Sequence, residues 1–197
     1  MDFKNSQTKV NLMRAFAGES QARNRYTIAA GEATRQKQHM IADVFHFTAY
    51  QEKEHAEIFY SHLQELAGET IHIDGGYPID ISTDLVSLLK SAHHNEYEEY
   101  EDVYQNFSEV AKQEGFVKVS QDFKNIAEIE KTHGDRFEMF ACMLENNELY
   151  SSASTCRWVC LNCGFIFEGT QVPERCPVCD HDQGYFLHLE MAPYTKE

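Results

Sequence analysis

The sequence has no apolar run approaching the ~20 residues that a membrane-spanning helix needs. Its first ten residues are polar and lack the apolar core of a secretion signal, so we expect a cytoplasmic protein without a membrane partner. Positive charge is also scarce, because 17 Lys and Arg oppose 32 Asp and Glu, which gives a formal net charge of −15. Such a surface repels phosphate backbones and anionic lipids, which argues against nucleic-acid binding.

Proline is scarce as well, with four in 197 residues, and only Pro78 precedes residue 150. Residues 8–147 are rich in alanine, glutamate, glutamine, lysine and leucine at helical spacing, whereas glycine and proline interrupt short apolar segments after residue 150. This change predicts a helical domain over residues 1–150 and a small, turn-rich domain over residues 151–197. We expect residues 151–154, Ser-Ser-Ala-Ser, to be a short linker.

Four long helices are expected in the first domain, over residues 8–35, 40–67, 83–114 and 117–146. The junctions within the first and second pairs are short, so each pair should form an antiparallel hairpin. The connection between the pairs, residues 68–82, is far longer and contains Gly75, Gly76 and Pro78. Two hairpins joined by a long connection are typical of a ferritin-like bundle. The expected fold is therefore an all-α four-helix bundle followed by a small domain of β-strands and turns.

The pattern Glu-x-x-His occurs in two of the expected helices, as Glu52 with His55 and as Glu130 with His133. Residues three apart on a helix share a face, so each pair can offer an oxygen and an imidazole nitrogen to one metal ion. Taken singly, either pair is better explained as solvated surface, since both residue types are common there.

Two further glutamates face these motifs across the expected hairpins. Glu19 and Glu52 are equally far from the first turn, and Glu96 and Glu130 from the second. Each is about 16 residues from its turn, so all four lie roughly 25 Å along the bundle at ~1.5 Å per residue. The two halves match, with 77 residues from Glu19 to Glu96 and 78 from Glu52 to Glu130. Four glutamates with two histidines at this height are the set that holds two iron or manganese ions in a bundle core.

The residues around these glutamates look like core, which argues against an exposed acidic surface. Ala22 and Tyr26 follow Glu19 at helical spacing. Carboxylates buried in such a stripe without a metal ion would be protonated or very costly. The sequence therefore predicts a buried dinuclear metal site. Glu99, three residues after Glu96, adds a carboxylate on the same face.

Four of the six cysteines form two Cys-x-x-Cys pairs, Cys160 with Cys163 and Cys176 with Cys179. Two such pairs provide four thiolates that close a tetrahedron around one metal ion. The spacing does not select the metal, because Zn²⁺ and iron both accept tetrahedral sulfur. A structural zinc ribbon therefore stays open as an alternative to a redox iron.

The segment Ala-Gly-Glu-Ser-Gln-Ala-Arg-Asn-Arg-Tyr at residues 17–26, both Glu-x-x-His motifs and the cysteine pairs together resemble rubrerythrin over nearly the whole chain. The tail resembles rubredoxin, which implies one iron in the four-cysteine site besides two iron ions in the bundle. The resemblance implies a peroxidase that reduces hydrogen peroxide to water in oxidative-stress defence. Its electrons would come from reduced pyridine nucleotide, NAD(P)H, through a separate reductase or a rubredoxin.

The resemblance also implies a role for each ligand in the bundle. Glu52 and Glu130 match bridging carboxylates. Glu19 and Glu96 match terminal ligands, and His133 matches the ligand of the second iron.

One iron in this family exchanges a glutamate for a histidine on reduction, at positions that match Glu99 and His55. The exchange is reasonable because a less positive site can release an anionic ligand for a neutral one. Tyr26 and Tyr104 match tyrosines that hydrogen-bond the ligand carboxylates. Without the resemblance, both tyrosines would be interpreted as core aromatics.

Some residues fall outside these patterns. His93, one turn before Glu96, is expected to be solvated or beside the site rather than a ligand. Gly134 lies in mid-helix, where glycine costs roughly 1 kcal/mol relative to alanine. Cys142 and Cys156 are expected to be packing residues.

Two other function classes compete with the peroxidase. A ferritin-like ferroxidase could handle or store iron and carry a structural zinc ribbon, but iron oxidation needs no electron input and leaves the cysteine tail without a purpose. A structural or regulatory zinc-binding module is disfavoured by the carboxylate pattern. A tail placed after the last helix cannot easily reach a site ~25 Å along its own bundle, so a homodimer or a larger homo-oligomer is expected.

Overall fold

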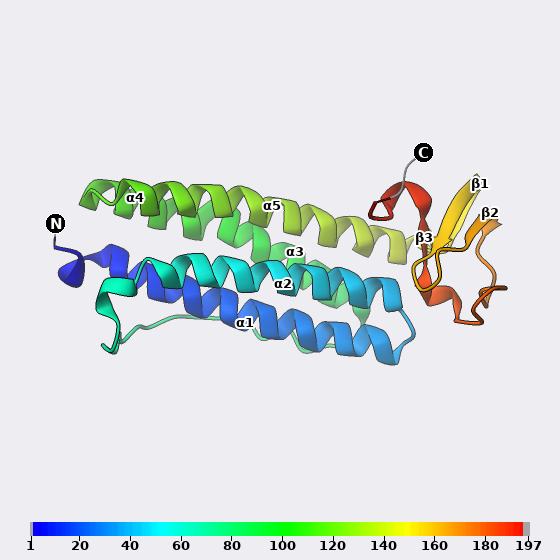
Figure 1. Ribbon diagram of the computed structural model, residues 1–197, viewed down its shortest axis with the longest axis horizontal. Helices are drawn as coiled ribbons and strands as arrows, with labels where there is room; N and C mark the ends of the chain where they lie inside the picture. The colour runs from blue at the N-terminus through cyan, green and yellow to red at the C-terminus, as the bar shows by residue number, and fades with distance from the viewer. Residues whose placement is uncertain (1, 195–197) are drawn as a thin grey trace.

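The computed structural model describes residues 2–194, which form a long helical bundle with a small sheet at one end (Figure 1). The helices are α1 (Gln7–Arg35), α2 (His39–Ser61), α3 (Leu85–Glu98), α4 (Tyr104–Glu114) and α5 (Val117–Glu145). A π-helical turn, Glu99–Val103, joins α3 to α4 without a break, so the five segments make four rods. The fold is the expected ferritin-like four-helix bundle with a small C-terminal sheet.

Tight turns produce the two antiparallel hairpins. The chain leaves α1 through Lys37, which has a positive φ of 59°, and enters α2 at His39. Gly115 ends α4 with a φ of 92°, a conformation that glycine adopts without steric cost. Each short connection brings consecutive helices side by side.

Two of the predicted helix boundaries are wrong. The second helix was expected to reach residue 67, but α2 ends at Ser61 and a separate 3-10 turn covers Gln64–Leu66. The third was expected to begin at residue 83, but the Asp84 carboxylate accepts a hydrogen bond from the Ser87 backbone N–H and so caps a helix that begins at Leu85.

Two apolar clusters fill the bundle. The cluster nearer the sheet includes Phe45 and Phe137, and the cluster at the other end includes Phe59 and Phe123. Between them lies a layer of buried glutamates and histidines, namely Glu19, Glu52, His55, Glu96, Glu130 and His133. Such a layer breaks the apolar core and marks the functional part of the bundle.

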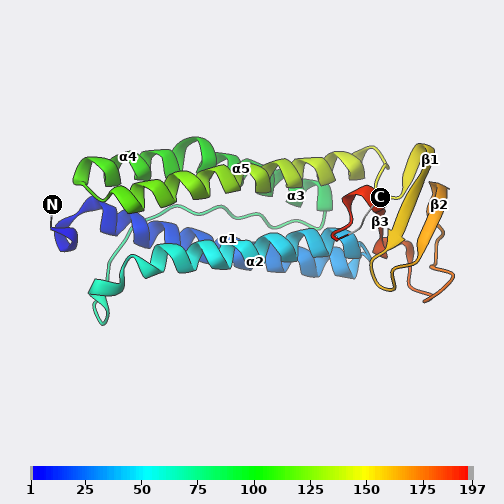
Figure 2. The ribbon, with the colours of Figure 1, turned by 45° about the horizontal axis from the view of Figure 1, so that its top comes forward.

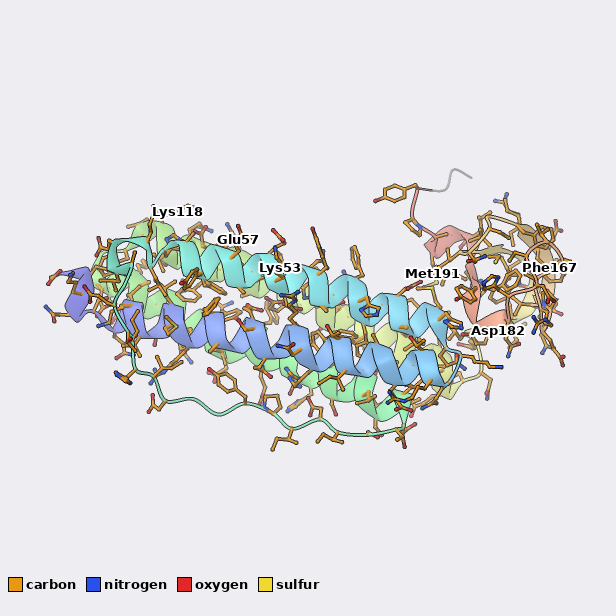
Figure 3. All side chains as sticks on the ribbon, turned by 60° about the horizontal axis from the view of Figure 1, so that its bottom comes forward. Lys53, Glu57, Lys118, Phe167, Asp182 and Met191 are labelled. Carbon is orange, nitrogen blue, oxygen red and sulfur yellow. The ribbon has the colours of Figure 1, made fainter. Side chains whose placement is uncertain are left out.

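A long segment, residues 67–84 and called the strap below, connects α2 to α3 and runs along the outside of the bundle (Figure 3). Two ion pairs fix it to α1. The Arg14 guanidinium pairs with the Asp74 carboxylate, and Arg25 Nη1 donates to Asp80 Oδ2 at 2.6 Å. The strap is therefore held against the bundle although it has no regular secondary structure.

The tail forms a three-stranded antiparallel sheet in the order β2-β1-β3. Its strands are β1 (Ser151–Cys160), β2 (Ile166–Gln171) and β3 (Phe186–His188). The prediction of a linker at residues 151–154 is wrong, because these residues belong to β1 and Ser151 pairs with Gln171. The backbone of this segment pairs with β2, and short polar side chains do not prevent such pairing.

The tail packs on the end of the bundle formed by the α1–α2 turn (Figure 2). Val159 and Leu187 of the sheet join the apolar cluster of the bundle. The His39 ring stacks on the Tyr185 ring with centroids 4.0 Å apart, and the Tyr150 hydroxyl donates to Gln38 Oε1 at 2.5 Å. The two parts of the chain therefore share a core.

Candidate metal centres

Each of the four rods contributes to the polar layer at the same height. Glu19 lies on α1 and Glu96 on α3, both essentially inaccessible to solvent. The Glu-x-x-His pairs lie on α2 and α5, where the three-residue spacing turns both members of each pair inward. The structure thus brings together six of the residues that the sequence predicted as bundle ligands.

These side chains form two overlapping groups in which the ligand atoms lie within 4.8 Å of one another. The first group contains Glu19, Glu52, His55 and Glu130, and the second contains Glu52, Glu96, Glu130 and His133. Glu52 and Glu130 belong to both groups, with one oxygen available to each. This is the arrangement of two adjacent metal ions bridged by two carboxylates.

The imidazole nitrogens approach the bridging carboxylates closely. His55 Nδ1 lies 2.9 Å from Glu130 Oε1 and 3.2 Å from Glu52 Oε2. His133 Nδ1 lies 2.8 Å from Glu130 Oε2 and 3.0 Å from Glu52 Oε1. The Nδ1 atoms of both histidines therefore point at the centres of their groups.

The donor set fits two metal ions. These short nitrogen–oxygen distances lack hydrogen-bond geometry, and nine buried side-chain atoms of the layer have no hydrogen-bond partner among the described residues. They belong to Glu19, Glu52, His55, Glu96, Glu130 and His133. Buried polar atoms are normally satisfied, and a cation at each group would satisfy the atoms that converge on it.

Two tyrosines hold the remaining carboxylate oxygens. The Tyr26 hydroxyl donates to Glu96 Oε1, and the Tyr104 hydroxyl donates to Glu19 Oε1. Both tyrosines are buried. Burial, together with the nearby carboxylates, raises the pKa of each phenol well above its usual value, so both remain protonated donors. Each terminal glutamate is thereby left with one oxygen facing a metal group.

Without metal ions, the layer holds protons. Burial is the main cause that raises the pKa of Glu19 and of Glu96, and neighbouring carboxylates add to it. Burial opposes protonation of His55 and His133, but the surrounding glutamates outweigh it and raise their pKa values to about 10 and about 12. Metal ions would replace these protons as the positive charge of the site.

Glu99 lies outside both groups. It is the first residue of the π-helical turn, and its Oε1 atom lies 3.9 Å from the position that a Cβ on Gly18 would occupy, on the strap side of α1. Burial and the charges of Glu96, Glu130 and Glu52 raise its pKa well above the usual value. The structure thus places His55, and not Glu99, in the first metal group.

Two residues that the sequence left unexplained have structural partners. His93 Nδ1 lies 3.0 Å from the Gly134 carbonyl oxygen, so this nitrogen is directed at backbone and not at the metal groups. A Cβ at Gly134 would lie 2.6 Å from Tyr97 Cδ2. Glycine is required there because the Tyr97 ring packs directly against α5.

The four paired cysteines converge in the tail. The sulfur atoms of Cys160 and Cys179 are 3.8 Å apart, and those of Cys163 and Cys176 are 3.7 Å apart. A tetrahedron with metal–sulfur bonds of about 2.3 Å has edges of about 3.8 Å. The sulfur geometry therefore fits one metal ion.

The environment of these thiols is asymmetric. Burial raises the pKa of Cys160 to about 12, whereas a hydrogen bond from the His181 backbone N–H lowers the pKa of Cys179 to about 6. Cys160 and Cys176 are buried, but Cys163 is exposed. One edge of the centre therefore faces solvent, where an electron donor can approach.

The two other cysteines lie apart from the cluster. Cys156 Sγ lies 3.6 Å from His188 Nδ1 within the sheet, and Cys142 Sγ lies 3.5 Å from Glu138 Oε1 on the surface of α5. Both are partly buried. They pack against their neighbours, as the sequence predicted.

Sequence reasoning missed the arginines beside the site. Arg136 Nη1 donates to Thr48 Oγ1 at 2.9 Å, and burial lowers the pKa of this guanidinium. Its position three residues after His133, on the same helix face, was the available signal. Arg25, directly before Tyr26, lies over the tyrosine ring at 5.4 Å from its centroid.

A ferritin-like bundle that buries two bridged carboxylate–histidine groups and carries a four-cysteine centre defines a dinuclear metalloprotein with an attached rubredoxin-type centre. The Rubrerythrin family model matches residues 10–141, and the model described as "Rubrerythrin, rubredoxin-like domain" matches residues 158–187. The chain belongs to the rubrerythrin family. The predicted cofactor sites, a di-iron site in the bundle and a four-cysteine iron site in the tail, are confirmed as sites of this family.

Relatives match along nearly their whole length. The rubrerythrin of Clostridium perfringens is 41% identical over 184 residues, covering 93% of this chain and 94% of that protein. The rubrerythrin of Nitratidesulfovibrio vulgaris is 37% identical over 183 residues, with coverage of 93% and 94%. Among solved structures, nigerythrin in a mixed-valence state superposes with a TM-score of 0.63 at 26% identity, covering 95% of this chain and 93% of that one. No helix among residues 2–194 has the length and apolarity to cross a membrane.

Proposed function

We propose that this protein is a non-haem di-iron peroxidase that reduces hydrogen peroxide to water with electrons passed through its four-cysteine iron. The observation that carries the proposal is the pair of metal groups sharing Glu52 and Glu130 in a chain that also holds a four-cysteine centre. When bound, two ferrous ions would supply the two electrons needed to break the O–O bond. Hydrogen peroxide and two protons are then converted to two water molecules.

The residues divide this work. Glu52 and Glu130 hold the two ions side by side, since each has one oxygen near each group. Glu19 and Glu96 bind from the ends, and the tyrosine hydroxyls fix their orientation. His133 completes the second group.

His55 and Glu99 form the adjustable part of the site. His55 belongs to the first metal group, and as a neutral ligand it would suit the lower metal charge of the reduced site. In the oxidised protein, Glu99 would take the place of His55 as a ligand. The π-helical turn at Glu99 supplies a local departure from regular helix where this side chain must move.

Electron delivery requires a second chain. Glu19 lies 16 residues before the end of α1 at Arg35, so the di-iron site is roughly 24 Å from the end where the tail docks. In a homodimer or larger homo-oligomer, the tail of one chain can lie beside the bundle of another. The external donor is a rubredoxin or a reductase that oxidises NAD(P)H. Thiols that serve as metal ligands are consistent with a reducing cytoplasm and a role in oxidative-stress defence.

Steady-state kinetics with a reduced rubredoxin as donor tests the peroxidase. We expect hydrogen peroxide to drive donor oxidation in the wild type, and Cys176→Ser to abolish this turnover while chemically reduced protein still consumes peroxide once. A Cys142→Ser variant, which leaves the cluster intact, is the matched control. Uptake and oxidation of Fe²⁺ without peroxide-dependent donor oxidation would instead identify a ferroxidase with a structural tail.

A further inference from the structure

A cleft of about 560 Å³ opens on the side of the bundle between α1, the strap and the segment that runs from α3 to α4. Gly18, Glu99 and Tyr77 of the strap line it, and a Cβ on Gly18 would lie 3.9 Å from both Glu99 Oε1 and Tyr77 Cε1. Because Glu99 is adjacent to the metal groups, the cleft approaches the di-iron site.

The cleft is far larger than hydrogen peroxide. A cleft of about 560 Å³ has room for much more than hydrogen peroxide, which has only one oxygen atom more than water. One wall is apolar and includes Ala15, Val103 and Phe107. An apolar wall gives hydrogen peroxide nothing to bind, but it suits the alkyl group of a larger hydroperoxide.

The charges around the cleft select a neutral ligand. Its two arginines are already paired, Arg14 with Asp74 and Arg25 with Asp80. Glu98 also lines the cleft, as does Glu99. An anionic hydroperoxide would therefore meet the Glu98 carboxylate without finding an unpaired cation among the lining residues.

Gly18 lies beside Glu99 in the lining of the cleft. A Cβ at this position would meet nothing closer than Glu99 Oε1 and Tyr77 Cε1, both at 3.9 Å, which is ordinary contact. Packing therefore allows alanine, although glycine within a helix costs about 1 kcal/mol. Glycine at this position leaves the space beside Glu99 free of a side chain.

We propose that this cleft binds neutral alkyl hydroperoxides, with the alkyl group on Val103 and Phe107 and the peroxide group beside Glu99. The proposal rests on the proposed function and extends its substrate class. The O–O bond of R–OOH breaks, two electrons come from a reduced rubredoxin through the four-cysteine iron, and two protons complete the products R–OH and water.

Kinetic comparison of cumene hydroperoxide with hydrogen peroxide tests the cleft. In Val103→Phe, which fills the apolar wall, we expect the ratio of kcat/KM for cumene hydroperoxide to that for hydrogen peroxide to fall at least tenfold. Val117→Phe, a matched change at an exposed valine outside the cleft, should leave the ratio unchanged. Metal content and Tm are measured for each variant, so that misfolding is recognised.

A second readout does not depend on turnover. Crystals of the metal-loaded wild type soaked with 2-phenyl-2-propanol, the alcohol product, should show it against Phe107, and crystals of Val103→Phe should not. An unchanged kinetic ratio in Val103→Phe, or the absence of the alcohol from the cleft of the wild type, would overturn the cleft assignment. If the wild type still reduces hydrogen peroxide, the proposed peroxidase function stands. Loss of all peroxide turnover in the wild type would instead refute the proposed function.

Discussion

Tyr26 on α1 donates its hydroxyl hydrogen bond to Glu96 on α3, and the contact has a counterpart in which Tyr104 on α4 donates to Glu19 on α1. Tyr26 follows Glu19 by seven residues, whereas Tyr104 follows Glu96 by eight. The π-helical turn between Glu96 and Tyr104 takes up the additional residue, because a π turn is wider than an α turn by one residue. This additional residue also explains why Glu19 and Glu96 are 77 positions apart, whereas Glu52 and Glu130 are 78 positions apart.

Removing one of these hydroxyls should slow the reaction without emptying the site. We expect Tyr26→Phe to lower peroxide turnover by roughly tenfold or more at unchanged metal content, because Glu96 loses the donor that orients it. Turnover and metal analysis provide the measurement. Tyr60→Phe, at an exposed tyrosine of α2, is the control. Unchanged turnover in Tyr26→Phe would remove the tyrosine from the mechanism.

Loss of a bridging carboxylate should empty the bundle. Glu52 contributes to both metal groups, so Glu52→Ala should retain fewer than two bundle iron ions per chain while the four-cysteine iron stays bound. Mössbauer spectra of anaerobically purified protein distinguish the two kinds of iron. Glu57→Ala, a solvent-facing change on the same helix, should bind iron normally. Two bundle iron ions in Glu52→Ala would refute the site.

The stability of metal-free protein should fall as pH rises. Folded-state pKa values of about 10 for His55 and about 12 for His133 exceed the usual 6.5. Their protonation therefore stabilises the fold fully below pH 6.5, and this stabilisation is progressively lost as pH rises toward the folded-state pKa values. The raised pKa of Glu19 acts in the same direction above pH 4.5. Each group that is protonated in the folded state but not in the unfolded state lowers the free energy of unfolding by up to about 1.4 kcal/mol for each unit by which the pH rises.

Thermal unfolding between pH 6 and pH 9 measures this dependence. Metal-free protein should lose Tm steadily, and metal-loaded protein should lose much less, because bound ions have already displaced the protons. A metal-free Tm that rises over this interval would contradict the protonated layer.

Replacing Gly134 in α5 should destabilise the protein. Gly134→Ala places a Cβ 2.6 Å from the Tyr97 ring, and we expect a loss of about 1–3 kcal/mol in the free energy of unfolding. Gly31→Ala makes the same change in α1, where the nearest atom, Arg35 Nη1, is 3.9 Å away, and should stabilise by about 0.5–1 kcal/mol. Denaturant titration of both variants measures the difference, and equal effects would show that the Tyr97 contact is unimportant.

A methyl group at the junction of bundle and tail should displace the tail. A Cβ on Gly184 would lie 1.9 Å from the Lys37 backbone carbonyl oxygen, which cannot move without opening the α1–α2 turn. Gly184→Ala should therefore increase amide hydrogen exchange at this turn and keep the visible absorption of the four-cysteine iron. Ser154→Ala, an exposed change in β1, should have no effect on exchange. Unaltered protection in Gly184→Ala would show that the docking is dispensable.

The order of residues along the chain was enough to predict the fold class and the candidate ligands of both metal sites, while the cysteine spacing left iron and zinc open for the tail. Helical periodicity, hairpin symmetry about the turns and the spacing of Glu52 with His55 are local properties, and they fix which side chains meet at one height. The short separations within the Cys-x-x-Cys pairs act in the same way. Ligand type and local geometry together suffice to define such sites.

The completion of these sites depends on how the helices, the strap and the tail pack together. Packing directed Glu99 toward the strap, left no room for a side chain at Gly134, and placed the tail on the end of the bundle at Gly184. Each of these outcomes depends on atoms from segments far apart in the chain that compete for the same space. Spacing along one helix carries no information about that competition, so it could not be predicted before the segments were placed in three dimensions.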